Sequence, residues 1–395
     1  MISFDEAVEF VRSIAKPLET ETIAIANAAG RILARPVVAQ IDSPRSDVSA
    51  MDGYAVREED LKSFPALLQL VGGSFAGRGW AGSVAPGTCV RIFTGAPLPE
   101  GADRVIIQEN VRSEGNEVVI DGHPGPGRHI RARQSDFSTQ DRLLPPGRRL
   151  DARAIVAAAA ADVAAVEVYR KPRFHILSTG DELAEPGTAR HRTNAIPESV
   201  SFGVAALAAQ WGAEPSGRAR LADDLQDMEH AAGIAVGQSD LVVVTGGASV
   251  GEKDFAKRMF EPLGLELIFA KVAIKPGKPV WFGRVGGKLV IGLPGNPTSA
   301  LVTARLFLAP LLAGMTGQPI ERALAWRNVP LASPLKDCGP RETFHRARLV
   351  EGSAEILSFQ DSSAQKALAE ADLLLRQRAN APAQSPGELV QVLDF

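Results

Sequence analysis

Glycines, hydroxyls and carboxylates gather in three short segments of this chain, each directly after an apolar run. The segments read STGDEL at 178–183, TGGASVGEKD at 245–254 and GLPGNPTSA at 292–300. In an open parallel sheet, the loops that follow the strands meet at the carboxyl edge, which is where ligands bind. We therefore expect the three segments to line one crevice.

The second and third segments are suited to contact with an anion. Gly246 and Gly247 carry no Cβ, so a ligand can approach the backbone closely, and Ser249 adds a hydroxyl. Pro294 and Asn296 precede an expected helix whose first N–H groups favour negative charge. Because the glycines form no known nucleotide fingerprint, tight strand-to-helix turns and a ligand cradle stay equally open.

A short segment shaped by glycine and proline, KVAIKPGKPVW, carries Lys271, Lys275 and Lys278. On an apolar segment, a lysine either extends to solvent or meets an anion. Three lysines beside the expected crevice make a phosphate or oxyanion site as reasonable as a solvated surface.

Carboxylates complement these lysines. Glu182 lies in the first segment, Asp254 lies in the second, and Asp223 and Asp224 stand where a helix is expected to begin. Capping explains an acid at a helix start, so at least one of that pair needs no functional role. Carboxylates beside lysines suit a hard cation that bridges to phosphate, which predicts Mg²⁺. The six histidines show no metal-ligand spacing, which disfavours a transition-metal site.

Composition limits the class of protein. The 395 residues are 45% hydrophobic and 23% charged, which is typical of an ordinary soluble protein with several domains. A net charge of -3 argues against nucleic acid and against a membrane surface as partners. Two cysteines far apart in sequence fit a reducing cytoplasm. The apolar run at 154–168 contains Asp162 and is too short to span a bilayer, so we expect a buried or interfacial helix.

Four patterns follow one another along the chain and position these segments. Residues 3–15 read as an amphipathic helix opened by a capping box. From 47 to 144, short β-prone pieces alternate with Gly/Pro turns, which predicts a β-rich module. From 171 to 317, continuous apolar strands alternate with helices, which predicts a parallel sheet covered on both faces. After 320, closely spaced short strands predict a small β-barrel or sandwich.

Taken together, the motifs resemble those of the molybdopterin molybdenumtransferase family, which includes MoeA and the gephyrin E domain. The matching pieces stand in the family's order and read SAMDGYAV, RIFTGAPLPEGADRVIIQE, STGDEL, TGGASVGEKDF, KVAIKPGKP and GLPGNPTSA. The family's late glycine-serine segment is matched here only by Ser362, and Gln134 and Ser135 replace the family's glycine and glutamate before Asp136.

The resemblance implies a multidomain α/β fold built from four domains. These are an elongated N-terminal domain (1–46 plus 145–170), a β-rich insertion (47–144), a doubly wound molybdopterin-binding α/β domain (171–318) and a C-terminal β-barrel (319–395). It further implies a homodimer whose active cleft is shared between the α/β domain of one subunit and the insertion of the other. The resemblance also implies a protein partner, which would be a molybdopterin adenylyltransferase or an apo-molybdoenzyme.

The implied reaction takes adenylylated molybdopterin and molybdate as substrates, inserts molybdenum and releases AMP with the help of a divalent cation. Two alternatives stay open. One is a molybdopterin adenylyltransferase, and the other is a molybdopterin-binding scaffold without turnover.

Positions that match the family's motifs carry the implied site. The implied catalytic residues are Asp52, Glu182, Asp254, Lys271 and Lys275. The implied ligand contacts come from Gly246, Gly247, Ser249, Asp136, Arg346, Pro294 and Asn296. The implied metal ligands are Asp223 and Asp254. Asp52, in SAMDGYAV, would point across the dimer, whereas without the resemblance its Asp-Gly turn is explained by a carboxylate that bonds its own backbone.

Overall fold

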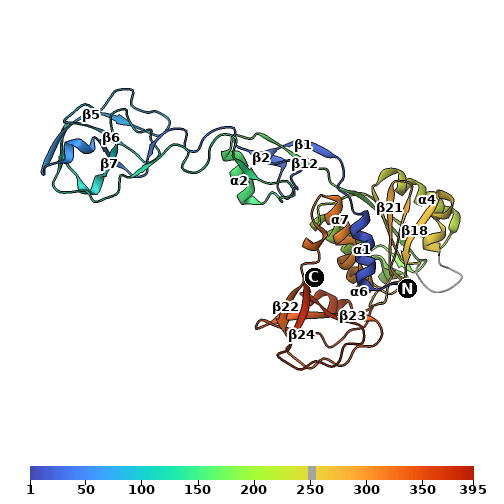
Figure 1. The fold of residues 1–395 in the computed structure, drawn as a ribbon. Helices are drawn as coiled ribbons and strands as arrows, with labels where there is room; N and C mark the ends of the chain where they lie inside the picture. The colour runs from blue at the N-terminus through green and yellow to red at the C-terminus, as the bar shows by residue number, and fades with distance from the viewer. Residues whose placement is uncertain (248–254) are drawn as a thin grey trace. The chain divides into compact units, whose positions relative to one another are not determined.

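The chain divides into two compact units in a computed structural model, which describes residues 1–247 and 255–395 (Figure 1). The first unit contains 1–21, 30–34 and 167–395, and it therefore holds both chain termini. The second unit contains 22–29 and 35–166.

A six-stranded sheet forms the centre of the first unit. Its strands, in spatial order, are β16 (Glu214–Leu221), β13 (Arg173–Thr179), β17 (Leu241–Thr245), β21 (Lys288–Leu293), β20 (Trp281–Val285) and β18 (Leu265–Ala270). The first four strands are parallel, as predicted. The prediction of a parallel sheet is wrong at the other edge, where β20 runs antiparallel to both of its neighbours. Only Gly286 and Gly287 connect β20 to β21, and so short a turn can join only antiparallel strands.

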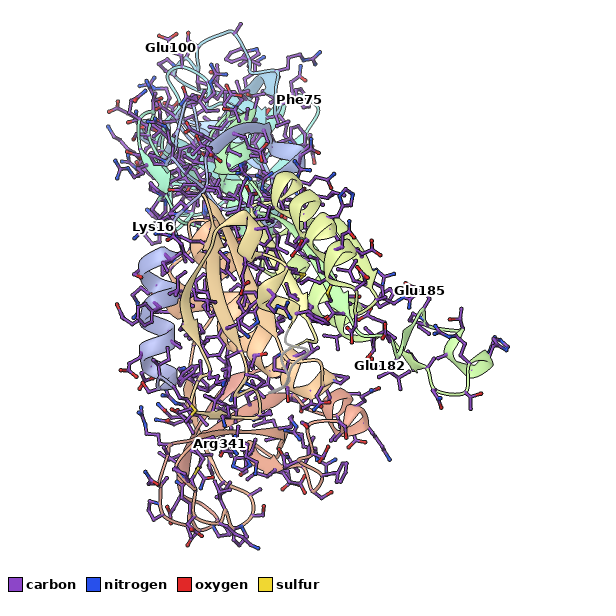
Figure 2. All side chains as sticks on the ribbon, turned by 90° about the vertical axis from the view of Figure 1, so that its right-hand side faces the viewer. Lys16, Phe75, Glu100, Glu182, Glu185 and Arg341 are labelled. Carbon is purple, nitrogen blue, oxygen red and sulfur yellow. The ribbon has the colours of Figure 1, made fainter. Side chains whose placement is uncertain are left out.

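An arm of residues 182–198 leaves the sheet after β13. Its two short strands, β14 (Leu183–Ala184) and β15 (Ile196–Pro197), pair in parallel with each other. Figure 2 shows Glu182 and Glu185 near the root of this arm, which projects from the α/β part of the unit.

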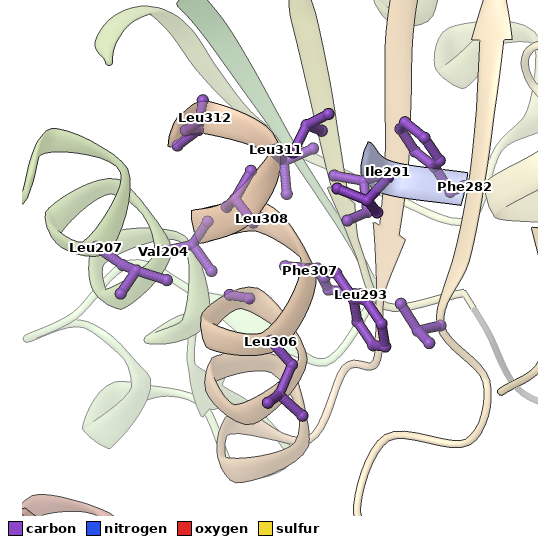
Figure 3. Packing of buried hydrophobic residues seen from close by; sticks show 14 of the residues in the cluster. Val204, Leu207, Phe282, Ile291, Leu293, Leu306, Phe307, Leu308, Leu311 and Leu312 are labelled. Atoms are coloured by element: carbon purple, nitrogen blue, oxygen red, sulfur yellow. The ribbon is translucent and has the colours of Figure 1, made fainter. Parts of the chain in front are cut away.

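Helices cover both faces of the sheet because its strands are apolar on both sides. On one face, Ile176, Val243 and Ile291 belong to a core shared with the helices α1 (Phe4–Ile14), α3 (Val200–Gln210), α6 (Pro297–Thr303) and α7 (Ala309–Met315) (Figure 3). On the other face, Leu177, Val242 and Val290 pack with α4 (Leu225–Gln238). The predicted double cover is confirmed.

The helical run 297–315 is almost entirely buried in this core. A π-helical stretch, Ala304–Leu308, joins α6 to α7. Within the described part of the chain, this run alone is long and apolar enough to cross a membrane, but 94% of it is buried inside the protein. Such burial is typical of the core helix of a globular domain.

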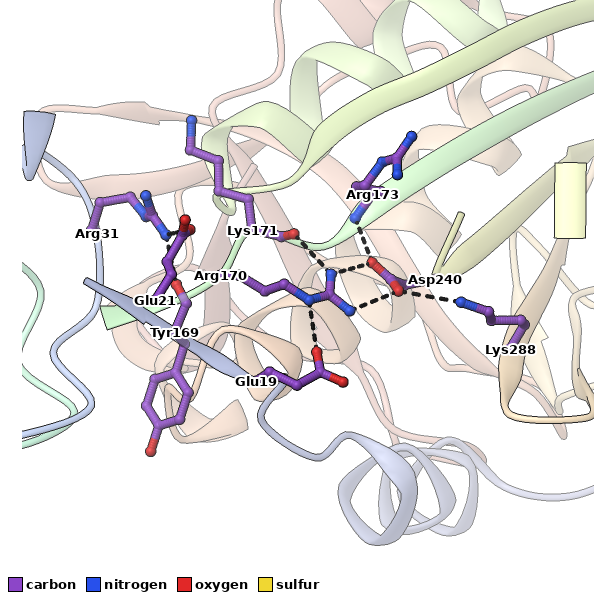
Figure 4. Close-up of polar contacts among 9 residues, drawn as sticks. All are labelled: Glu19, Glu21, Arg31, Tyr169, Arg170, Lys171, Arg173, Asp240 and Lys288. Carbon is purple, nitrogen blue, oxygen red and sulfur yellow. Dashed lines mark hydrogen bonds and ion pairs between the residues drawn. The ribbon is translucent and has the colours of Figure 1, made fainter. Parts of the chain in front are cut away.

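A polar cluster anchors the amino edge of the sheet, opposite the loops discussed below (Figure 4). Arg170 donates from Nη1 and Nη2 to the two carboxylate oxygens of Asp240, at 2.6 and 2.9 Å. The backbone N–H of Arg173 also donates to Asp240. Burial by itself would raise the pKa of Asp240, but the bonds from Arg170 and Arg173 outweigh it and lower the pKa. Glu19 accepts from Arg170 as well, which ties the N-terminal segment to the sheet.

A small barrel closes the C-terminal end of the first unit. The strands β22 (Arg327–Pro330), β26 (Leu389–Asp394), β25 (Leu373–Gln377), β23 (Glu342–Val350) and β24 (Ser353–Ile356) pair in that order. A bridge between Leu331 and Ala354 then joins β22 to β24, which completes the ring. This confirms the predicted barrel. The short strand β19 (Ile274–Lys275) adds to the outside of β23.

The second unit is built around a β-sheet, as its Gly/Pro-punctuated pattern predicts. Its strands, in spatial order, are β7 (Arg104–Ile107), β4 (Gly53–Val56), β6 (Thr88–Ile92), β5 (Ala66–Ser74), β9 (Glu117–Ile120) and β8 (Arg112–Glu114).

The apolar run 154–168 differs from its prediction as one helix. It forms the end of α2 (Ala152–Ala160) and then β12 (Ala165–Tyr169), because Asp162 adopts a left-handed φ of 61° that ends the helix.

Candidate functional site

A cleft of about 880 Å³ lies at the carboxyl edge of the parallel strands. Its walls come from the loops after β13, β17 and β21, which confirms that the three polar segments share one crevice. β13 lies between β16 and β17 in the sheet, so the chain passes outward to β16 and then returns across β13 to β17. The cleft therefore lies at the point where the strand order reverses, the position that ligands occupy in doubly wound sheets.

Six residues predicted for the site are brought together here. They are Glu182, Asp223, Gly246, Gly247, Pro294 and Asn296. Among the lining residues that the structure describes, three are carboxylates and none is a lysine or an arginine.

Gly246 and Gly247 form the floor of the cleft in backbone conformations that favour glycine. Their φ angles are 89° and 60°. A Cβ on Gly246 would lie 2.5 Å from the carbonyl oxygen of Thr179, a contact that real Cβ atoms essentially never make. The two glycines therefore bring the ends of β13 and β17 together and leave their own backbone open to the cleft.

The third wall is the beginning of the helical run 297–315. Asn296 is its N-cap, but the Asn296 side chain caps no helical N–H and instead donates to the hydroxyl of Ser362 at 3.1 Å. Pro297 at the first helical position has no N–H to satisfy. Among the described residues, no side chain caps the remaining N–H groups of the first turn, so they are available to an anion in the cleft.

The two neighbouring aspartates before α4 have different roles. Asp224 is the N-cap of the helix and accepts from the N–H of Asp227 at 3.0 Å, so the capping explanation holds for this residue. Asp223 lines the cleft, and its N–H donates to the carboxylate of Asp181 at 3.0 Å. The loop after β13 thus holds the backbone of Asp223 in place.

Several lining residues were missed by reasoning from the sequence. Glu198 is 2% exposed and bonds both the N–H and the hydroxyl of Ser201, in the first turn of α3. The others are Thr179, Ser199, Thr245, Ser363 and Gln365. Hydroxyls directly after apolar strands are a usable signal for Thr179 and Thr245, whereas Ser363 and Gln365 come from a distant segment that only the fold brings here.

The predicted lysines lie beside the cleft and outside its described lining. Lys271 and Lys275 follow β18 at the same edge of the sheet, but both are exposed and neither lines the described cleft. Of their loop, Pro279 reaches the lining. The physical reason is that β19 pairs Ile274 and Lys275 with Glu342 and Thr343, which draws this part of the loop towards the barrel.

Arg346 also lies outside the lining. It is 1% exposed, and its Nη2 donates to the carbonyl of Asp361 at 3.0 Å. Burial lowers the pKa of this guanidinium. Because Asp361 leads directly into the segment that carries Ser362 and Ser363, Arg346 supports the cleft wall from behind.

Two predicted residues belong to the second unit. Asp52 does not bond its own turn. Its carboxylate accepts from the N–H and the hydroxyl of Thr94, at 2.8 and 2.9 Å, and these bonds lower its pKa. In the same motif, the hydroxyl of the fully buried Ser49 donates to the carbonyl of Met51 and serves the fold of this unit. Asp136 is exposed, and its N–H donates to the carbonyl of Ser43.

Ser249 and Asp254 lie outside the described residues. In the rest of the chain, no group of three or more His, Cys, Asp or Glu side chains is placed to hold a metal ion.

Comparison with known proteins agrees with this architecture along the whole chain. Residues 2–161 match the MoeA N-terminal region (domain I and II), 175–314 match a family described as a probable molybdopterin binding domain, and 328–395 match the MoeA C-terminal region (domain IV).

Two relatives and one solved structure illustrate the likeness. The molybdopterin molybdenumtransferase of Haemophilus influenzae is 35% identical over 410 residues, covering 100% of this chain and 99% of the relative. That of Nostoc sp. is 36% identical over 352 residues, covering 85% of this chain and 79% of the relative. The crystal structure of a molybdopterin biosynthesis MoeA protein from Pyrococcus horikoshii superposes with a TM-score of 0.85 at 26% identity, covering 100% of both chains. The chain belongs to the molybdopterin molybdenumtransferase family of molybdenum cofactor biosynthesis.

Proposed function

We propose that this protein inserts molybdenum from molybdate into adenylylated molybdopterin and releases AMP, and that the reaction depends on a divalent cation. The observation that carries the proposal is the cleft at the carboxyl edge of the sheet, in which glycine backbone, an uncapped helix start and carboxylates converge. The helix start, the glycines and the hydroxyls of the lining each suit a phosphorylated pterin. The helix start meets its phosphate oxygens, the glycine floor admits its bulk, and the hydroxyls orient its polar edge.

The carboxylates suit a magnesium ion by their chemistry. Mg²⁺ prefers hard oxygen ligands and commonly takes only one or two carboxylates, with phosphate oxygens and water completing its shell. Asp223 lines the cleft and would hold the ion, together with Asp254 by the family resemblance. When bound, the ion would offset the charge of the phosphates, which the described carboxylates alone would repel.

The remaining site residues and the assembly enter the proposal through the resemblance. Lys271 and Lys275 would bind phosphate or molybdate oxygens from the loop beside the cleft, and Glu182 would manage a proton during metal insertion. We also propose the four-domain division given above and a homodimer in which Asp52 of the partner's β-rich insertion completes the cleft.

Single-turnover AMP release with molybdate and Mg²⁺ tests the function. We expect Asp223→Asn and Glu182→Gln to slow release by about 100-fold, the usual cost of losing a charged group in a catalytic site, without a change in melting temperature. Asp227→Asn is the matched control, because it removes the same charge in the first turn of α4 from an exposed position outside the cleft.

Three outcomes would contradict the proposal. Formation of adenylylated molybdopterin from ATP and molybdopterin would identify an adenylyltransferase. Tight binding of adenylylated molybdopterin without molybdate-dependent AMP release would identify a scaffold. Full activity in both cleft variants would remove the site assignment.

A further inference from the structure

The arm at 182–198 supplies a large share of the cleft wall although it has little structure of its own. Five lining residues belong to it, namely Glu182, Leu183, Ile196, Pro197 and Glu198. Its only ladder is the two-residue pairing of β14 with β15. So short a pairing is marginal in water, so contacts with the rest of the unit must hold the arm in place.

Arg218 on the edge strand β16 contacts both sides of the arm. Its Nη2 lies 3.1 Å from both carboxylate oxygens of Glu185 on the outgoing side of the arm. Its Nη1 lies 3.2 Å from the carboxylate of Glu198 on the returning side. The same guanidinium stacks on the ring of Phe202 in α3, with 4.2 Å between its carbon and the ring centroid. One planar cation therefore joins both sides of the arm to the sheet and to a helix.

Arg220 repeats the arrangement two residues further along the strand. Residues two apart in a strand face the same side, so Arg218 and Arg220 both point towards the arm. The Nη1 of Arg220 donates to the carbonyl of Leu183, which is the first residue of β14. The edge of the sheet thus holds the arm at its root and at both of its sides.

We propose that Arg218, assisted by Arg220, is a positioning residue that sets the wall of the cleft by clamping the arm. The catalytic consequence rests on the proposed function, whereas the clamping itself does not. An edge strand with two outward arginines has an ordinary explanation, since charges on an edge discourage pairing between molecules. That explanation does not account for the contacts of the Arg218 guanidinium with Glu185 and Glu198, which come from opposite sides of the arm. Glu198 is also 2% exposed and lines the cleft.

Hydrogen exchange read by mass spectrometry tests the clamp on the full-length protein without any substrate. In Arg218→Ala, we expect amides in 183–197 to exchange about tenfold faster or more, while those of β17 stay protected. Glu185→Gln removes the charge of the carboxylate that Arg218 contacts on the outgoing side, and amide exchange on that side should become faster. This second variant keeps the test decisive if Arg218→Ala folds poorly. The control is Arg192→Ala, a cation of the same arm whose side chain makes no hydrogen bond or ion pair with the described residues.

Kinetics test whether the clamp matters to the cleft. We expect Arg218→Ala to raise KM for adenylylated molybdopterin about tenfold with kcat nearly unchanged, because the wall contacts the ligand equally before and during the reaction. The root of the arm stays fixed through the contact of Asp181 with Asp223, so Glu182 keeps its place. Arg218→Lys should restore only part of the affinity, since an ammonium cannot bridge two carboxylates in one plane.

Two results would overturn the inference. Unchanged exchange across 183–197 in both Arg218→Ala and Glu185→Gln would show that the clamp does not hold the arm. Faster exchange with an unchanged KM would show that the arm does not shape the site. If no molybdate-dependent turnover exists at all, the exchange result still stands, so failure of the proposed function remains distinguishable.

Discussion

Thr94 satisfies the Asp52 carboxylate within the β-rich unit, and this changes how the motif SAMDGYAV is understood. Its N–H and hydroxyl hold the carboxylate, and Arg91 adds a favourable charge nearby. Gly53 is required because a Cβ there would lie 1.9 Å from the carbonyl oxygen of Ile106. Tyr54 packs under the guanidinium of Arg91, 4.9 Å from ring centroid to carbon. The motif is therefore a well-connected turn that keeps Asp52 ionised and fixed.

His175 gives the molecule a pH dependence that can be measured. It is 7% exposed in the middle of β13, its Nδ1 has no hydrogen-bond partner among the described residues, and burial lowers its pKa. Because the pKa of His175 is below its ordinary value of 6.5 in the folded protein, the unfolded state binds the proton more readily. The contribution of neutral His175 to the free energy of unfolding is therefore fully present above pH 6.5 and is lost as the pH falls below that value.

We therefore expect His175→Leu to reduce the loss of stability between pH 7.5 and pH 5.5, as measured by urea unfolding at the two values. The slope should not vanish, because burial also lowers the pKa of His345. The exposed His230 on α4 offers a control, and His230→Gln should leave the slope unchanged. A slope as steep in His175→Leu as in the wild type would rule out this origin.

Between elements, the C-terminal barrel is attached to the cleft through a few contacts near the start of α6. Asn296 donates to Ser362, and Thr298 donates from its hydroxyl to the carbonyl of Ala364 at 3.4 Å. Behind this segment, Arg346 holds the carbonyl of Asp361. The barrel therefore contributes Ser363 and Gln365 to the wall only as long as this segment stays attached.

A double-mutant cycle across this attachment should show coupling. We expect Asn296→Ala and Ser362→Ala each to cost about 0.5–1.5 kcal/mol of stability, the range for one exposed hydrogen bond, and the double variant to cost little more than either. Each should also raise KM for adenylylated molybdopterin several-fold. Additive costs in urea unfolding would mean that the bond between the two side chains contributes nothing.

The elements themselves were largely predictable, since local patterns decide them. Continuous apolar residues predict β17 and β21, and the capping box of Ser3 and Glu6 forms as expected at the start of α1. What could not be predicted depends on distant partners. The antiparallel direction of β20 follows from its short turn to β21, and the pairing of β14 with β15 depends on contacts with β16.

At the scale of the whole molecule, the cleft draws on residues from Thr179 to Gln365, and this explains which of the predicted residues line it. The strand-to-loop transitions predicted the place of the glycines, because a parallel sheet brings such loops together whatever their spacing in sequence. Asp223 was predicted from a helix start and from the family resemblance. No local pattern could predict that Ser363 lines the cleft or that Lys275 lies outside the lining, since both depend on how the barrel docks. The importance of Asp52 came from the family resemblance alone.

Mixed subunits can decide whether Asp52 completes the cleft of a partner. We expect Asp52→Asn and Asp223→Asn homodimers each to be nearly inactive. After unfolding and refolding together, half of the dimers are mixed and one of their two sites is intact, so AMP release should recover to about a quarter of the wild-type rate. If both residues served the same subunit, every site in the mixture would lack one carboxylate and no activity would return. Refolding two differently tagged Asp223→Asn preparations is the control, and a protein that sediments as a monomer at assay concentration would also contradict the shared site.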